Sequence, residues 1–550
     1  MQTAHGNLHL EIQTSRKSPV GIVRTTFRED GKMRHTQHGR ITGCSLEQLK
    51  LLQLAFRERV VPVDDPQAFR MLDSREHGAS YAVLAIAKQV GLHRVLYSRP
   101  QPWVNSALAM IVGRLVSAGS KLALCNHQPN TCLWELCGIA EPPDVDVHCY
   151  APMDQLLQRQ TAIQRRLARR HLNAGHLVLY DITSVYFEGD YQDSELVTFG
   201  YNRDGKQGHE QVVVGLICTA QGCPVGVEVY AGNTKDDTTV IDKVHEIKAD
   251  YGIEKVVFVG DRGMLTHSKI DALKDEQDLQ TISALTHGEM MALLKRKVIA
   301  LDLFDERSIH EITDPTEPTR RYCLCRNPQT AQRETKTRER LLTLTTEALA
   351  GIAAYKRATT VATLGARVGK VLAKYKMGKF IQWSIDADPD RATSSAHRLR
   401  WSIDADKVAR EQSFDGCYII TSDVEQDAMN TAEVVHAYKS LTFVERAFRN
   451  LKTVQLEIRP VYHKTDERIR SHVFLCMLAY YLQWHMEQRL APLFAADGQG
   501  PERRWTFRGV IDCLAQITRN RVTVNGAEFY QNSTPTPEQN EILGLLQVTM

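Results

Sequence analysis

Two apolar segments that each lead into an aspartate constrain the fold of this chain more than any other feature. In HLVLYDITSVYF an apolar run ends at Asp181, and KVVFVGD ends at Asp261. The unbroken apolar character of KVVFVG is typical of a strand that is buried on both faces. Between the two aspartates, EQVVVGLICTAQGCPVGVEVY predicts two strands joined at Ala220–Pro224, and a helical segment follows over Thr239–Asp250. This order of elements predicts a mixed α/β sheet flanked by helices.

At 550 residues the chain is too long for one hydrophobic core, so we expect several structural regions. The sequence patterns divide it into five: a mainly helical region (1–150), α/β segments (151–290), a β-rich insertion (291–425), helical segments (426–490) and a small C-terminal region (491–550). Strand-like pieces such as KVIALDLF and CYIITS predict the β-rich insertion. WSIDAD occurs there twice, from Trp383 and from Trp401, which two arms of an antiparallel hairpin, a small duplication or chance would explain.

A helical pattern in the first region allows two interpretations. The stretch ASYAVLAIAKQVGLHRVL has apolar residues at helical spacing and a break at Gly91, and the pattern repeats over Trp103–Leu115. A helix-turn-helix that contacts DNA has this pattern, and so does an ordinary helical bundle.

Basic residues are unevenly distributed along the chain. The formal net charge is only +3, from 68 basic and 65 acidic residues, so the total charge indicates no particular partner. Basic residues nevertheless cluster over Arg16–Arg40, Arg159–Arg170 and Arg320–Arg340. Each cluster by itself fits a solvated surface, whereas three in a near-neutral chain favour a polyanion such as DNA. The longest apolar stretch is too short to span a bilayer, so we expect a cytoplasmic protein with no membrane partner.

The twelve cysteines follow no regular spacing, which fits free thiols in a reducing compartment. One cluster combines three of them with a histidine, in CNHQPNTCLWELC from Cys125 to Cys137. Its spacing matches no standard zinc pattern, and it leads into an apolar helical run. A packed helical segment is therefore favoured over a zinc site.

Asp181 and Asp261 are predicted to face one site, because ligands of α/β proteins gather at the ends of strands. Carboxylate oxygens are suitable ligands for a hard cation. Magnesium is typically held by one or two carboxylates together with water and substrate phosphates.

A helix predicted from Thr431 to Lys452 supplies a third carboxylate. At about 100° per residue, one face of this helix within an arc of roughly 60° carries a tyrosine, a leucine, a glutamate and two cations. These residues are Tyr438, Leu441, Glu445, Arg449 and Lys452. A buried face is not expected to hold Glu, Arg and Lys together. The face therefore fits either contact with a metal ion and a phosphate backbone, or a solvated surface with a Glu445–Arg449 pair.

The local motifs around these acids, DITSVYFEG, GDRGM and YKSLTFVERAFRNLK, resemble the three catalytic signatures of the DDE transposases. The resemblance is to the insertion-sequence branch, whose RNase H-like fold is interrupted by β-strands. It extends to RPVYHKTDERIRSHVFL after the third acid and covers about 172–490. It implies an RNase H-like catalytic core, made of a mixed sheet flanked by helices and interrupted by the β-rich insertion.

The resemblance also implies roles for single residues. By position, Asp181, Asp261 and Glu445 match the catalytic triad, which binds two Mg²⁺ ions and accepts Mn²⁺ as a substitute. Arg262 is a candidate contact for a DNA phosphate, although a salt bridge explains an arginine there equally well.

The branch has a further signature that runs Tyr, Arg, Glu, Lys along one helix. Tyr438, Glu445 and Lys452 occupy three of its places, whereas Leu441 stands where the arginine is expected. Leucine cannot contact a phosphate ionically, so this function is either absent or supplied by a neighbour such as Arg449. Tyr438 and Lys452 are the other expected DNA contacts.

The implied activity is cut-and-paste transposition of a bacterial insertion sequence, by a homodimer that binds double-stranded DNA on the nucleoid. The N-terminal region is expected to bind the terminal inverted repeats, and the insertion to contact the same DNA ends. Two alternatives stay open. One is an RNase H-like nuclease without strand transfer, and the other is a DNA-binding remnant that has lost catalysis.

Overall fold

The computed structural model of the chain divides into two compact units. The smaller unit comprises Met1–Ala79, Pro129–Cys132 and Asp512–Glu541, and the larger unit comprises Ser80–Gln128, Leu133–Ile511 and Ile542–Met550. The structure describes residues 7–14, 18–29, 31–58, 69–172, 177–203, 205, 208–235, 256–261, 279–305, 308–354, 360–387, 397–454, 456, 458, 461–497, 503–524 and 527–550. The helix expected over Thr239–Asp250 lies outside these residues.

An eight-stranded mixed sheet forms the centre of the larger unit, with the strand order β10-β11-β14-β9-β8-β5-β6-β7. β8 pairs in parallel with β5 and β9, and the other neighbours are antiparallel. In sheet order the strands are β10 (His310–Asp314), β11 (Glu317–Arg326), β14 (Cys417–Ser422), β9 (Leu279–Ala284), β8 (Val256–Val259), β5 (Leu177–Tyr186), β6 (Gln211–Thr219) and β7 (Pro224–Ala231). The predicted mixed α/β sheet is confirmed.

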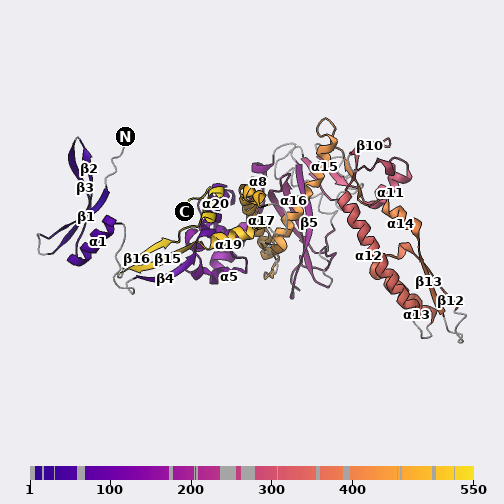
Figure 1. Cartoon of the computed structure of the whole chain (residues 1–550), viewed down its shortest axis with the longest axis horizontal. Helices are drawn as coiled ribbons and strands as arrows, with labels where there is room; N and C mark the ends of the chain where they lie inside the picture. Colours follow the sequence, from indigo (N-terminus) through magenta and orange to yellow (C-terminus); the bar gives the residue numbers. More distant parts are fainter. Residues whose placement is uncertain are drawn as a thin grey trace. The chain divides into compact units, whose positions relative to one another are not determined.

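Helices flank this sheet (Figure 1). α8 (Gln160–His171) and α17 (Asp466–Arg489) contact β7, and α16 (Leu441–Arg449) contacts β5 and β6. α15 (Thr431–Lys439) contacts β9 and β14. Every residue of β6 is buried, because its sequence QVVVGLICT is apolar on both faces of the strand.

The N-terminal part of the larger unit is helical, as expected from the sequence. Its helices are α2 (Gly78–Gln89, which begins in the smaller unit), α3 (Leu92–Leu96), α4 (Pro102–Val116), α5 (Lys121–Asn126), α6 (Leu133–Leu136) and α7 (Ala151–Gln158). Gly91 separates α2 from α3 with a positive φ of 66°, which glycine adopts without strain. Most of α4 is buried, and it contacts α6, α7 and α17. A recognition helix must expose one face to DNA, so this burial favours the helical bundle over a helix-turn-helix.

The prediction of a β-rich insertion over 291–425 was wrong in two respects. β10, β11 and β14 belong to the central sheet, and the segment outside the sheet is dominated by helices, namely α12 (Pro328–Ala353), α13 (Val361–Tyr375) and α14 (Ala405–Gln412). KVIALDLF contains no strand and follows α11 (His287–Lys295) as turns and a short 3-10 helix.

The helical part of this region has its own small core. Leu342 and Leu349 of α12 pack with Leu364 and Val368 of α13, at spacings of seven and four residues that place each pair on one helix face. Helices α12 and α13 are accompanied by a hairpin of β12 (Ile381–Ala387) and β13 (His397–Ile403). Trp383 pairs with Trp401 across this hairpin, so the hairpin interpretation of the WSIDAD repeat is confirmed.

The basic leader of the chain forms strands, which the sequence patterns did not predict. In the smaller unit, one sheet consists of β1 (Asn7–Gln13), β2 (Val20–Glu29) and β3 (Lys32–Ile41), and α1 (Leu46–Glu58) packs against β1. A second sheet has the order β16-β15-β4, with β4 (Phe69–Glu76), β15 (Thr518–Val524) and β16 (Ala527–Asn532).

The C-terminal residues are consequently no separate region, because β15 pairs with β4 from the N-terminal part of the chain. The remaining helices are α18 (Ala491–Ala496), α19 (Phe507–Ala515) and α20 (Pro537–Leu546). Among the residues that the structure describes, no helix combines the length and apolar character needed to cross a membrane.

Candidate active site

Asp181 and Asp261 lie at equivalent positions on neighbouring parallel strands. Leu179 of β5 pairs with Val259 of β8, and each aspartate follows its member of this pair by two residues. Asp261 lies just beyond the end of β8, as predicted. Asp181 does not end its strand, because β5 continues to Tyr186 along its antiparallel neighbour β6. The two aspartates therefore meet where the parallel pairing of β5 and β8 stops.

Glu445 reaches the same place from α16. Apolar side chains recur at three- and four-residue spacing on this helix, and four residues that include Leu441 and Val444 are buried. Glu445 is exposed and lies beside this buried side, one helical turn after Leu441. Because α16 packs on β5 and β6, Glu445 lies near the point where the parallel pairing of β5 and β8 stops and the two aspartates meet.

A cavity of about 400 Å³, which we call the acidic cavity, contains the three carboxylates in its lining. Nine residues line it: Asp181, Asp261, Asn327, Tyr418, Tyr438, Lys439, Leu441, Thr442 and Glu445. Three acids that are far apart in the sequence thus share one concave surface. Asn327, Tyr418, Lys439 and Thr442 were not predicted from the sequence. Asn327 directly follows the last residue of β11, so its place beyond a strand end was the one available signal.

The helix predicted from Thr431 to Lys452 is interrupted. α15 ends at Lys439, α16 begins at Leu441, and a wider π-helical turn over Asn450–Val454 contains Lys452. A constant angle per residue does not hold across such a wider turn. Tyr438, Leu441 and Glu445 still line one cavity, as the predicted face required.

The two cations of that face lie elsewhere. Arg449 is exposed and Lys452 is only 8% exposed, and neither is among the residues that line the cavity. Leu441 is buried and contributes an apolar wall where a basic side chain was expected. Arg262, the other predicted DNA contact, lies outside the described residues.

Hydrogen bonds fix two of the carboxylates. The Tyr438 hydroxyl donates to Oδ1 of Asp261 over 3.1 Å, so Tyr438 contacts an acid directly, a contact that the sequence did not predict. The backbone N–H of Ile182 donates to Oδ1 of Asp181 over 2.8 Å.

The pKa of Asp181 is raised to about 7, mainly by burial and in smaller part by the negative charges of Asp261 and Glu445. The Ile182 hydrogen bond and the positive charge of Arg203 act in the opposite direction but do not compensate. Asp181 is thus a buried carboxyl group whose ionisation the two neighbouring carboxylates disfavour. Three carboxylates that share one cavity are a donor set that suits a hard divalent cation such as Mg²⁺. The residues fit that ion.

The family model of the transposase DDE domain matches residues 176–482, which is more than half of the chain. The chain belongs to this family. The match begins directly before β5 and ends within α17, so it includes all three acids and the helices next to them. No curated protein matches the chain.

Membership of the DDE transposase family identifies the chain as an enzyme that transfers phosphoryl groups on DNA. DDE transposases bind DNA and generally use divalent metal ions. The mixed sheet with its flanking helices is the RNase H-like core of this family.

Proposed function

We propose that this transposase mobilises an insertion sequence of the branch with the Tyr-Arg-Glu-Lys signature. It would bind the terminal inverted repeats, cleave the DNA at the ends of the element and join the freed 3′-hydroxyl to target DNA. The observation that carries the proposal is the cavity in which Asp181, Asp261 and Glu445 meet. A homodimer that pairs two ends is the proposed active form.

Asp181, Asp261 and Glu445 would together hold two Mg²⁺ ions, with Mn²⁺ as a substitute. When bound, the ions supply activation of the attacking water or 3′-hydroxyl and stabilisation of the leaving oxygen in an in-line displacement. Tyr438 orients the Asp261 carboxylate through its hydrogen bond, and Leu441 closes the cavity with an apolar wall. The side chains thus position the charges that the displacement needs.

An assay with a plasmid that carries the element's ends tests this function. The transposase should nick the ends and also join them to a second DNA molecule in the presence of Mg²⁺. Cleavage without any joining would instead support a nuclease of the same fold. Binding of the ends without cleavage would support an inactive remnant.

We propose that Lys439 takes the place of the missing arginine in contacting a DNA phosphate. Lys439 is exposed and lines the cavity, two residues before Leu441 in the sequence, whereas Arg449 does not line it. Lysine is a common phosphate contact that acts as a point charge.

Lys439→Gln is expected to slow end cleavage by about 10- to 100-fold, because a hydrogen bond to a charged group contributes about 1.5–3 kcal/mol. Arg449→Gln is the matched comparison, since it removes the same charge outside the cavity. Single-turnover cleavage of an end fragment measures both. A larger loss in Arg449→Gln than in Lys439→Gln would transfer the role to Arg449.

We also propose that the basic sheet of the smaller unit, defined as β1, β2 and β3, contacts the DNA ends. β3 is exposed along nearly its whole length. Arg24 pairs with Glu11 over 2.7 Å and Arg34 with Glu29 over 3.3 Å. In the described part of the chain, Arg28, Lys32 and Arg40 have no acidic partner. These three cations suit the phosphate backbone of DNA.

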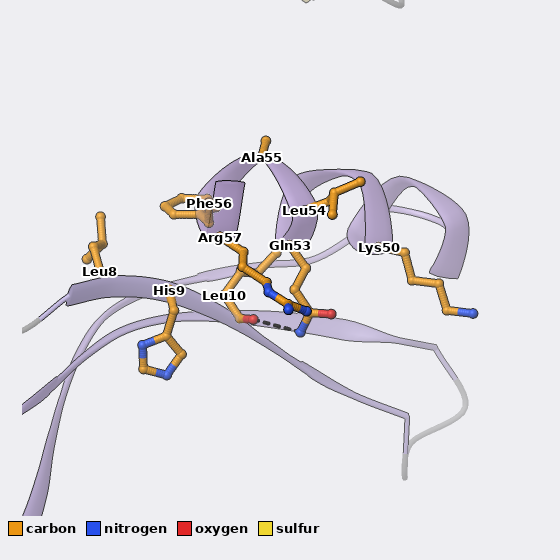
Figure 2. A pocket seen from close by; sticks show the side chains of 9 residues that line it. All are labelled: Leu8, His9, Leu10, Lys50, Gln53, Leu54, Ala55, Phe56 and Arg57. Atoms are coloured by element: carbon orange, nitrogen blue, oxygen red, sulfur yellow. Dashed lines mark hydrogen bonds between the residues drawn. The ribbon is translucent and has the colours of Figure 1, made fainter. Parts of the chain in front are cut away.

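α1 places two further basic side chains beside β1. Gln53 of α1 donates a hydrogen bond to the carbonyl oxygen of Leu10 over 2.9 Å, which ties the helix to β1. A pocket of about 850 Å³ lies at this junction, and Figure 2 shows Lys50 and Arg57 of α1 and His9 of β1 among its side chains. No acidic residue lines the pocket, so its charge agrees with contact to a phosphate.

The variant with Arg28→Gln, Lys32→Gln and Arg40→Gln is expected to bind end DNA more weakly and with a smaller salt dependence. Each lost phosphate contact should lower the slope of log K against log salt by about 0.9. The matched control is Arg24→Gln with Arg34→Gln, which removes cations that acids already neutralise. Titrations at several salt concentrations measure the slopes. An unchanged slope in the triple variant would exclude the basic sheet as a DNA contact.

A further inference from the structure

Three side chains from separate parts of the larger unit meet outside the acidic cavity. His171 is the last residue of α8, Cys223 lies in the turn between β6 and β7, and His485 lies on α17. One ring nitrogen of each histidine and the sulfur atom of Cys223 all lie within 4.8 Å of one another. In the described part of the chain, this is the one group of three potential ligands at such spacing. We propose that these residues bind a divalent transition-metal ion, for which zinc is the best match.

The donor atoms determine which metal fits. Two imidazole nitrogens and one thiolate sulfur suit Zn²⁺, which is bound at about 2.0–2.1 Å by nitrogen and about 2.3 Å by sulfur. Mg²⁺ prefers oxygen ligands and would be a poor match. None of the three residues lines the acidic cavity, so the two sites are separate. Because their donor atoms differ, they would select different metals.

One of the three side chains has a buried polar atom that makes no hydrogen bond within the described part of the chain. Nε2 of His485 is buried and has no hydrogen-bond partner among the residues that the structure describes. A buried polar atom without a partner is energetically unfavourable. Coordination of a metal by this nitrogen would remove that cost. Cys223 is only 1% exposed, so a metal held here would be shielded from water on the sulfur side.

His171 has a neighbour of the kind that supports metal ligands. Its Nε2 lies 2.9 Å from the hydroxyl oxygen of Tyr481. Binding of a metal through Nδ1 would keep this contact, with Nε2–H donating to the tyrosine oxygen. Histidine ligands of metals almost always donate their second ring nitrogen to such an acceptor.

The protonation states also agree with metal binding. The pKa of His171 is lowered to about 4 and that of His485 to about 3, in both cases mainly by burial and in smaller part by the positive charge of Arg170. Both imidazoles are therefore neutral at pH 7, which is the form that binds a metal. Burial raises the pKa of the Cys223 thiol, so it remains protonated in the metal-free protein. Metal binding would release this proton to solvent as the sulfur–metal bond forms.

The position of the site indicates a structural role. α8 and α17 both contact β7, and the Cys223 turn leads directly into that strand. A metal held by all three would fix both helices to this side of the sheet. It would stabilise the core without contacting the reacting DNA strand.

Metal content and spectra of the full chain test this proposal. After treatment with a chelator and addition of Zn²⁺ in excess followed by gel filtration, the chain should retain about one zinc ion, because zinc bound by histidine and thiolate is held tightly. Co²⁺ should give a thiolate charge-transfer absorption. Mg²⁺ at millimolar concentration should displace neither ion.

Cys223→Ser and His485→Gln should each lose the retained zinc, and Cys223→Ser should also lose the charge-transfer absorption. Cys218→Ala is the matched control, since Cys218 is equally buried in β6 but outside the group, and it should retain the metal. Asp261→Asn should retain zinc too, which separates this site from the catalytic one. Circular dichroism of each variant checks its fold. Absence of zinc from the wild-type chain, or zinc retained by folded Cys223→Ser, would overturn the proposal.

Discussion

Asp181→Asn, Asp261→Asn and Glu445→Gln should each reduce cleavage of the transposon end by roughly 1000-fold while the end remains bound. Each change keeps the shape of the side chain and removes the negative charge that holds a divalent cation. Metal ions contribute several kcal/mol of transition-state stabilisation, and a loss of about 4 kcal/mol corresponds to this factor. Single-turnover cleavage in Mg²⁺ measures the loss, and gel shift without metal measures binding.

Asp427→Asn is the control for these three variants, because Asp427 is an exposed acid in the loop before α15 and does not line the cavity. It should cleave at the wild-type rate. Wild-type cleavage by any of the three cavity variants would show that this carboxylate is not part of the catalytic site. Loss of end binding in all three cavity variants would instead indicate that these carboxylates are needed to bind DNA rather than to catalyse its cleavage.

The meeting of Asp181 and Asp261 could be predicted from the sequence because it depends on local patterns. Apolar runs of strand length define β5 and β8, and parallel pairing then places residues after Leu179 beside residues after Val259. The prediction erred in ending β5 at Asp181. Pairing with β6, at Asp181↔Leu216, extends the strand, and pairing with a distant segment is not visible in the strand's own sequence.

The segment around Glu445 is helical as predicted, but it does not form the single continuous helix that was predicted. Its residues favour helix throughout, so no proline or glycine marks the boundary at Ser440 or the wide turn that contains Lys452. Hydrogen bonding in the folded chain decides both. Lys439 was missed for this reason, because a single continuous helix places it away from the face of Glu445.

Long-range pairing accounts for most of the remaining errors. β4 and β15 lie in the same sheet although almost the whole chain separates them, so neither strand indicates the other in the sequence. The group of His171, Cys223 and His485 is hidden in the same way, since its members share no local motif. The cluster from Cys125 to Cys137 is by contrast close in sequence, but among the described residues its side chains do not form a group of three potential metal ligands.

Asp415→Ala should destabilise the helical part of the insertion by about 3–5 kcal/mol, because it would leave the charge of Arg338 buried without its partner. Arg338 of α12 donates to both carboxylate oxygens of Asp415, over 2.8 Å to Oδ1, and Thr335 donates to Oδ2 over 2.6 Å. Both charged residues are buried. Burial acts to raise the pKa of Asp415, but these hydrogen bonds outweigh it and hold the pKa below its ordinary value. The stabilisation is therefore present at neutral pH and is lost in acid, as pH falls through that lowered pKa.

The effect of Asp415→Ala should extend to the active site, because Asn327 caps the start of α12 and also lines the acidic cavity. Hydrogen exchange should show weaker protection along α12, and cleavage should fall with it. The double variant Arg338→Met with Asp415→Leu provides the sharpest comparison, since replacing a buried ion pair with apolar side chains of similar size is often neutral. It should recover protection of α12. If Asp415→Ala instead costs under about 1 kcal/mol, the pair behaves like an exposed salt bridge, and other contacts position α12 beside the cavity.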